Sequence, residues 1–175
     1  MIQQRQTLNG LHLCWAGRAH AAGVAAIAVQ AVKEGHEGAT PESGPWLFTL
    51  DFPSFFPVMT HAANRGLREE MYRANITRAS AGDADNTPLI NSILSLRAEK
   101  AALLGFANFA ELSMASKMAT LDKAQALLEQ LRAAGIDAAR RDLADIQQHA
   151  AEAGYAGELQ QWDVSYWAER LKEVG

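Results

Sequence analysis

The chain has 175 residues, of which 49% are apolar, and a formal net charge of −4. This composition excludes a disordered or fibrous protein, and the length suffices for a domain with its own core. The negative balance and scattered basic residues argue against nucleic acid or a membrane surface as a partner. Cys14 is the only cysteine, which excludes an intrachain disulfide, favours a reducing compartment and predicts a cytoplasmic protein.

Apolar residues recur at helical spacing from Ala19 to Lys33, and the segment 35–45, which contains glycines and prolines, ends this pattern. We therefore predict a first helix followed by a loop. The segment 46–52 places aromatic or leucine side chains at every second position before Pro53, which predicts one short strand with an aromatic face. No second segment alternates as clearly, so the backbone of this strand must find hydrogen bonds elsewhere.

Apolar residues at helical spacing predict five further helices, most of them opened by a residue that can cap a helix. They run from about residue 55 to Ser80 after a cap at Ser54, from Thr87 to Gly105, from 106 to 112 with a cap at Asn108, from Thr120 to Ala150, and from Asp163 to Val174. Gly135 can kink or divide the fourth of these, since glycine costs roughly 1 kcal/mol relative to alanine in a helix. The predicted fold class is mainly α, a helical bundle or array with at most one short strand, in a single domain over residues 1–175.

His36 and Glu37 begin like the zinc-peptidase motif H-E-x-x-H, in which two histidines one helical turn apart bind zinc and the glutamate activates water. Position 40 is Thr40 instead of the second histidine, and the surrounding glycines disfavour a helix. His61 and His149 stand alone among helical residues. We therefore predict no metal-binding residue and no cofactor-binding residue in this chain.

The acidic turn at residues 83–86 is similar to the start of a calcium loop, in which alternating oxygens surround the ion. The glycine expected at the sixth position is Pro88, and the glutamate expected at the twelfth is Leu94. A turn that caps the following helix is the interpretation that these residues favour.

Two local carboxylate pairs, Glu69 with Glu70 and Asp142 with Asp145, could in principle act as acid and base. Adjacent residues do not face each other on a helix, and the second pair lies next to arginines, as on an ordinary solvated face. A catalytic role for the Cys14 thiol would need a histidine partner; His12 and His20 are near it in sequence, but nothing in the sequence shows that either approaches the sulfur. We predict no catalytic residue.

Three stretches carry a resemblance to a known family. Their sequences are WLFTLDFPSFFPVMTHAANRGLREEMYRANITRAS, DNTPLINSILSLRAEKAALLGFANFAELSMASKMA and QQWDVSYWAERL. In this order they resemble the thimet-oligopeptidase-like zinc metallopeptidases, most closely the bacterial oligopeptidase A branch. The last stretch is similar to the family segment Q-P-W-D-x-x-Y-Y-x-E-x-L, with Gln161 in place of the proline and Trp167 in place of the second tyrosine.

This resemblance implies a large, almost wholly helical enzyme that cuts short peptides in a deep channel, using zinc held by H-E-x-x-H and a further glutamate. In the family these elements follow the W-D segment, so no catalytic residue carries over to a position of this chain. Residues 46–175 are expected to be an oligopeptidase-like helical region, and residues 1–45 an N-terminal helix and loop.

Three functional hypotheses follow. The leading one is a partial oligopeptidase-like protein that lacks the zinc motif, forms a helical substructure next to a peptide channel and is inactive as a peptidase alone. The second is a self-associating helical module, a homo-oligomer that uses the strand from Trp46 to Phe52 and exposed helix faces. The third is a hydrolase that uses a carboxylate pair at a new site.

Overall fold

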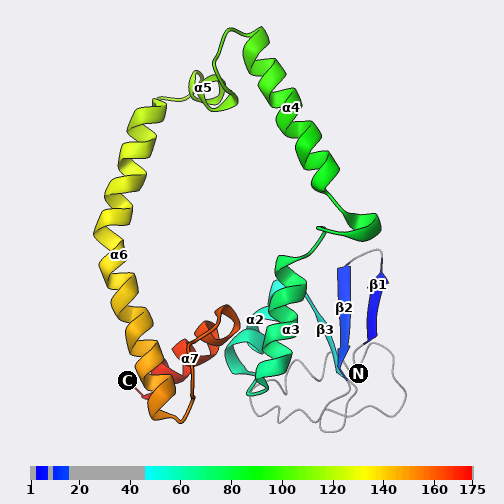
Figure 1. Ribbon diagram of the computed structural model, residues 1–175, viewed down its shortest axis with the longest axis vertical. Helices are drawn as coiled ribbons and strands as arrows, with labels where there is room; N and C mark the ends of the chain where they lie inside the picture. The colour runs from blue at the N-terminus through cyan, green and yellow to red at the C-terminus, as the bar shows by residue number, and fades with distance from the viewer. Residues whose placement is uncertain (1–2, 8–9, 16–45, 175) are drawn as a thin grey trace. The chain divides into compact units, whose positions relative to one another are not determined.

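The computed structural model describes residues 3–7, 10–15 and 46–174 (Figure 1). The predicted helix 19–33 and loop 35–45 lie outside the described residues. The chain divides into two compact units, one comprising residues 1–78 and 143–175 and the other residues 79–142. The mainly helical class is confirmed, whereas the single domain over residues 1–175 stays a prediction.

The first unit contains a three-stranded antiparallel sheet in the order β1-β2-β3. Strand β1 is Gln3–Thr7, β2 is Gly10–Trp15 and β3 is Trp46–Thr49. The predicted strand is therefore present, and β2 pairs with it, with Leu13 opposite Phe48. The sheet adds two strands to the one expected from the sequence, and β2 supplies backbone partners that the sequence pattern did not reveal.

Strand β3 leads directly into helix α2, Phe52–His61. Pro53 lies in the first turn of α2, where its fixed φ favours helix and its missing N–H leaves no donor unpaired. Phe52 was expected on the aromatic face of the strand, but it begins this helix and its side chain is 71% exposed. Ser54 does not cap the helix as predicted; its hydroxyl accepts a hydrogen bond from the Thr49 amide at 3.0 Å, across the strand-to-helix turn.

The single helix predicted to end at Ser80 is two helices in the structure. Helix α2 ends at His61, and α3 runs from Arg65 to Ile76. The break is set by Asn64, whose extended backbone and side-chain oxygen cap α3 by accepting a hydrogen bond from the Leu67 amide at 3.0 Å. The apolar spacing continues across this break, so periodicity alone did not locate it.

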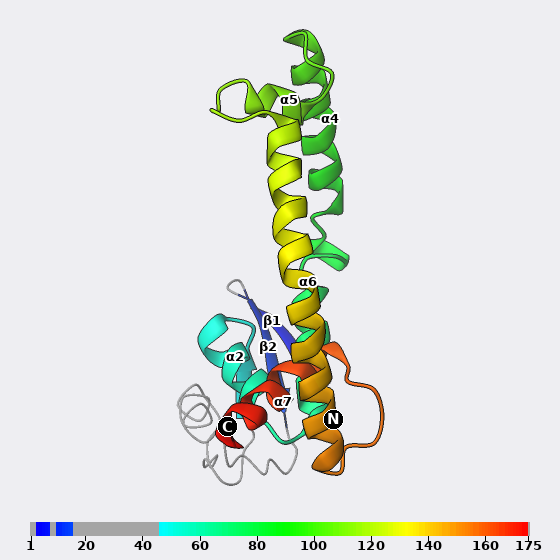
Figure 2. The same cartoon turned by 90° about the vertical axis from the view of Figure 1, so that its left-hand side faces the viewer.

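Helix α7, Gln161–Val174, packs against both α2 and α3 and completes the first unit (Figures 1 and 2). The core that joins these elements consists of Phe48, Leu50, Val58, Met59, Ala62, Leu67, Met71 and Trp162. Each large apolar side chain buried in this way stabilises the fold by roughly 1.5–3 kcal/mol. Trp162 comes from a distant part of the sequence, so α7 is an integral part of this core.

The second unit is built from short and long helices. Its elements are the 3-10 turn η1 (Gly82–Ala84), α4 (Thr87–Leu103), α5 (Phe109–Met114) and the first part of α6 (Leu121–Glu152). The Asn108 cap of α5 is confirmed, since its side chain accepts from the Glu111 amide at 3.0 Å. Gly105 follows α4 with a φ of 78°, a conformation that favours glycine. Helix α6 runs through Gly135 without a division.

None of the described helices combines the length and the apolar character needed to cross a membrane.

Candidate functional site

The densest polar cluster among the described residues surrounds the carboxylate of Asp163, near the start of α7. Arg65 binds it in a bidentate manner, with Nε 3.0 Å from Oδ1 and Nη2 2.9 Å from Oδ2. The Nη2 atom of Arg68 donates to Oδ1 at 2.9 Å, and the Tyr155 hydroxyl donates to Oδ2 at 3.2 Å. The Gln160 amide donates to Oδ2 at 3.1 Å. Asp163 is fully buried, so this cluster ties α7 to α3 inside the first unit.

Arg68 extends the same cluster to α2. Its Nε atom donates to the Trp162 carbonyl at 3.0 Å, and its Nη1 atom donates to the Ala62 carbonyl at 2.6 Å, at the end of α2. Its guanidinium lies 4.2 Å from the centre of the Tyr166 ring. The planar guanidinium can make these contacts together because its donors point in fixed, divergent directions.

The electrostatics of the cluster hold Asp163 in its ionised form. Burial alone raises the pKa of Asp163, but hydrogen bonds from Arg65, the Gln160 amide and Arg68 outweigh it, so that this pKa is lowered. The pKa of Arg65 is raised, chiefly by its hydrogen bond to Asp163. A carboxylate that is saturated with donors and stays ionised is a poor general acid. The cluster is therefore architectural.

Arginines also surround the indole of Trp162. The guanidinium carbon of Arg65 lies 5.4 Å from the centre of the Trp162 ring, and that of Arg73 lies 4.9 Å from it. Tyr72 packs on the same indole with ring centroids 5.8 Å apart. These contacts add cation–π attraction, and they hold the Trp162 indole of α7 against α3.

The W-D pair belongs to the segment that resembles the family, and the local role predicted for Asp163 is wrong. Asp163 was predicted to cap the last helix, whereas α7 begins at Gln161 and Asp163 lies in its first turn. Its carboxylate still accepts a hydrogen bond from the Gln160 amide, as an acidic residue in the first turn often does. The signal that could have pointed to a buried charge is Arg68, which lies among the buried apolar positions of α3, next to Leu67 and one turn from Met71.

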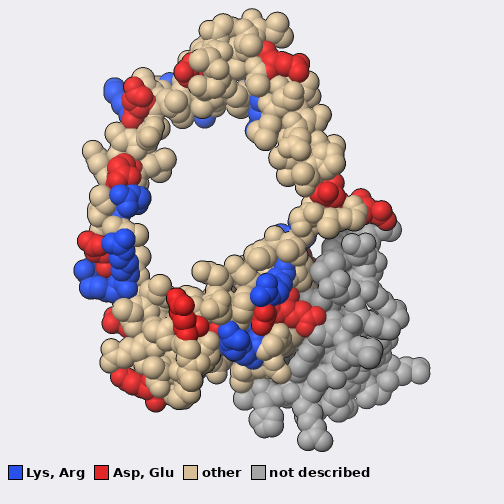
Figure 3. All heavy atoms as spheres, in the orientation of Figure 1, with Lys and Arg blue, Asp and Glu red and all other residues tan. Residues whose placement is uncertain are grey.

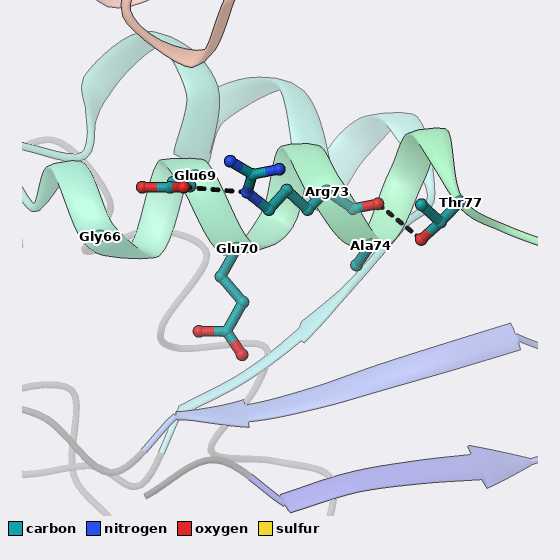
Figure 4. A pocket seen from close by; sticks show the side chains of 6 residues that line it. All are labelled: Gly66, Glu69, Glu70, Arg73, Ala74 and Thr77. Carbon is teal, nitrogen blue, oxygen red and sulfur yellow. Dashed lines mark hydrogen bonds and ion pairs between the residues drawn. The ribbon is translucent and has the colours of Figure 1, made fainter. Parts of the chain in front are cut away.

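An open depression of about 410 Å³ lies along α3 (Figure 4). The described residues that line it are Gly66, Glu69, Glu70, Arg73, Ala74 and Thr77. The Nε atom of Arg73 donates to Glu69 at 2.9 Å, whereas Glu70 points away from that pair (Figure 4). Burial raises the pKa of Glu70. Because Glu69 and Glu70 do not face each other, the pair does not form the shared site that acid–base catalysis needs, and the new-site hydrolase gains no support from it.

The other carboxylates and histidines singled out from the sequence fall at separate places. Asp85 accepts a hydrogen bond from the Thr87 amide at 2.9 Å, in agreement with a capping turn. The Nδ1 atom of His61 lies 3.2 Å from Nη2 of Arg170, and His149 packs edge-on against Trp167.

The remaining candidate pairs lie on α6 and on β2. Asp142 and Asp145 are both exposed on α6. His12 and Cys14 are two residues apart on β2. His20, His36 and Glu37 lie outside the described residues.

In the part of the chain that the structure describes, no group of three or more histidine, cysteine, aspartate or glutamate side chains is placed to hold a metal ion. These described residues therefore do not fit a zinc centre.

Comparison with known proteins places this helical arrangement in a family. Residues 58–174 match Peptidase family M3. The probable cytosolic oligopeptidase A of Arabidopsis thaliana is 56% identical over 149 residues, which cover 84% of this chain and 21% of the plant protein. Oligopeptidase A of Escherichia coli is 41% identical over 165 residues, which cover 89% of this chain and 23% of the bacterial protein.

The chain belongs to peptidase family M3. It spans about a fifth of the length of the relatives it matches. A dipeptidyl carboxypeptidase of Escherichia coli is a more distant relative, 30% identical over 129 residues that cover 73% of this chain and 19% of that protein. The M3 match runs from residue 58 to residue 174, so every member of the Asp163 cluster, from Arg65 to Asp163, lies within it.

Proposed function

We propose that this chain is a helical structural part of an M3 metallopeptidase, contributes no zinc ligand and has no peptidase activity on its own. The observation that carries this proposal is the M3 match over residues 58–174 in a chain that spans about a fifth of its oligopeptidase relatives. The names of these relatives imply that their substrates are peptides. In this proposal the chain forms a wall next to a bound peptide and does not act on the scissile bond.

The site geometry supports a structural role. In the buried cluster at Asp163, the charged groups make hydrogen bonds to one another and to backbone atoms of α2 and α7. Such a cluster fixes the relative placement of α2, α3 and α7, since a buried ion pair requires close, directed contacts. Zinc belongs, in this proposal, to the complete family enzyme and to residues other than those of this chain.

The test uses the purified chain beside intact Escherichia coli oligopeptidase A as a positive control. Cleavage of a quenched fluorescent peptide is followed with and without a chelator, and zinc is measured after dialysis. We expect no chelator-sensitive cleavage and substoichiometric zinc. Stoichiometric zinc together with chelator-sensitive turnover would show that the chain is a peptidase in its own right.

A second candidate is a homo-oligomer, favoured by two features of the first unit. Strand β3 lies at one edge of the described sheet order, and Phe52 and Phe56 stack at 5.0 Å with much of both rings exposed. An edge strand with apolar neighbours can pair with a second copy. Light scattering over a hundredfold range of concentration (on the order of 1–100 µM, where weak dimers form) tests this; a constant monomer mass argues against it.

A cytoplasmic location fits the cysteine usage and the name of the plant relative, which calls that protein cytosolic. A second plant relative is named organellar, so fractionation of cells that express a tagged chain is the experiment that decides. Recovery in an organelle fraction would overturn the cytoplasmic proposal.

A further inference from the structure

Residues 79–142 form a unit with almost no core of its own. Ala101 is the one buried residue among them. The large apolar side chains on α4 or directly after it are exposed instead: Leu89, Ile90, Ile93, Leu94, Leu96, Leu103 and Leu104. Figure 3 shows few charged atoms on the visible face of α4, in contrast to the charged side chains along α6. Because a helix in a protein gains most of its stability from packing, little in this unit stabilises α4.

The first half of α4 also has a low intrinsic preference for helix. Five of the residues 89–95 are β-branched or short and polar, namely Ile90, Asn91, Ser92, Ile93 and Ser95. Such side chains form helix less readily than alanine, leucine or arginine do. Arg97 stacks on Phe109 of α5, with its guanidinium carbon 5.0 Å from the ring centre, but α5 has six residues and none of them is buried. Helix α4 therefore lacks both packing and propensity.

Helix α6 is more stable, although it begins in the same unit. Its residues 121–142 are rich in good helix formers, and Arg132 forms an ion pair with Glu129 one turn away, at 2.6 Å. The last part of α6 belongs to the first unit, where Ala150 is fully buried and the side chain of Gln147 accepts from the Leu159 amide at 3.0 Å. Because helix propagates from an anchored turn without a new nucleus, α6 is held from this end.

We propose that α4 is a helix–coil switch, which forms and melts while α3 and α7 keep their structure. The Asp163 cluster and the apolar core hold α3 and α7, and neither includes a residue from 79–142. Opening of α4 therefore breaks none of these contacts, and segments with few buried contacts open at low free energy. This inference goes beyond the proposed function, because it concerns the conformation of α4 and not the cleavage of peptides.

Amide hydrogen exchange of the full chain, followed by mass spectrometry, measures this opening. We expect the amides of α4 to exchange within about 100-fold of their unfolded rates, whereas those of α3 and α7 are slowed by on the order of 1,000-fold or more. Peptides of α6 should be intermediate, with slowing that increases from residue 121 towards residue 152. Amides of α4 that exchange as slowly as those of α3 would overturn the switch.

Substitutions in α4 separate local opening from unfolding of the whole chain. Asn91→Ala and Ser92→Ala together raise helix propensity at two exposed positions, so they should slow exchange in α4 roughly fivefold and leave α3 and α7 unchanged. The matched control is Gln130→Ala at an exposed position of α6, which should leave α4 unchanged. If the double variant slows α3 and α7 as much as α4, then α4 opens only together with the core, and the inference is wrong.

Two further measurements bear on the same point. Exchange is compared at about 1 and 100 µM, because slowing of α4 at the higher concentration would show that a second copy holds the helix, against a switch within the single chain. Trypsin should cut after Arg97 or Lys100 before it cuts after Arg68, since proteolysis follows the population of the open form. Earlier cleavage after Arg68 would contradict the inference. The peptidase assay is independent of both measurements, so a failure of the proposed function is read from that assay alone.

Discussion

Replacing Asp163 with asparagine removes one charge from the buried cluster and leaves the shape of the side chain almost unchanged. The asparagine amide has one oxygen acceptor where the Asp163 carboxylate has two, and it carries no charge. Arg68 and Arg65 therefore lose a charged acceptor. The side chain of Arg68 is 3% exposed and cannot turn to water, whereas that of Arg65 is 41% exposed and can. The cost is therefore dominated by the charge left on Arg68.

Removal of one partner from a buried ion pair costs about 3–5 kcal/mol, whereas an exposed pair contributes about 1 kcal/mol or less. We expect Asp163→Asn to lower the free energy of unfolding of the first unit by about 4 kcal/mol, mostly through Arg68. With a urea m-value of about 2 kcal/mol/M, this corresponds to a midpoint about 2 M lower.

Urea unfolding followed by tryptophan fluorescence measures this change. All four tryptophans, at positions 15, 46, 162 and 167, lie in the residue ranges of the first unit, so the signal reports that unit. The matched control is Glu173→Gln, which removes an exposed ion pair to Arg170 on the same helix and should change the unfolding free energy by less than about 1 kcal/mol. An Asp163→Asn variant within about 1 kcal/mol of the wild type would refute this reasoning.

Three further predictions concern the first unit. The difference in free energy of unfolding between the wild type and Asp163→Asn should be complete above pH 3.8, the ordinary pKa of the carboxyl. This difference should be lost as pH falls through the lowered folded-state pKa of Asp163. A difference that stays constant down to pH 2 would contradict this. Glu70 has a raised pKa, so its charge costs stability as pH rises above 4.5, its ordinary value. Glu70→Gln should therefore raise the urea midpoint at pH 7 but not at pH 4, and a lower midpoint at pH 7 would contradict the burial effect. Met71→Ala leaves a cavity at a fully buried position and should cost about 2–5 kcal/mol in the same urea assay, a smaller loss indicating collapse of the site.

Local signals predicted much of the second unit, although Thr87, the expected cap, lies inside α4 after Asn86, and the helix expected at 106–112 is Phe109–Met114. Asn108 was recognised as a cap because its side chain can accept from an amide three residues on, and Gly105 as a helix end because glycine adopts positive φ. Thr120 caps α6 in the same way, with its hydroxyl 3.3 Å from the Lys123 amide. These signals act within a few residues of sequence, so the sequence contains all the information that they need.

Long-range pairings were harder to predict. Strand β1 consists of polar residues without alternation, so its pairing with β2 has no signature in periodicity. The bond between Arg68 and Asp163 joins positions 95 residues apart. Single-sequence spacing cannot show that a charged residue on an apolar helix face has its partner on another helix. The sequence therefore predicted Asp163 only as a helix cap within the family segment, and the buried cluster that it forms with Arg65 and Arg68 was not predicted.

Whether this chain contributes structure without catalysis is tested most directly by zinc-dependent peptide cleavage with the purified chain alone. The chain, dialysed against excess zinc, is incubated with a quenched fluorescent peptide beside intact Escherichia coli oligopeptidase A, with and without a chelator. We predict no chelator-sensitive rate from the chain under conditions in which the intact enzyme is active. A zinc-dependent rate that follows the chain through purification would contradict the proposed function.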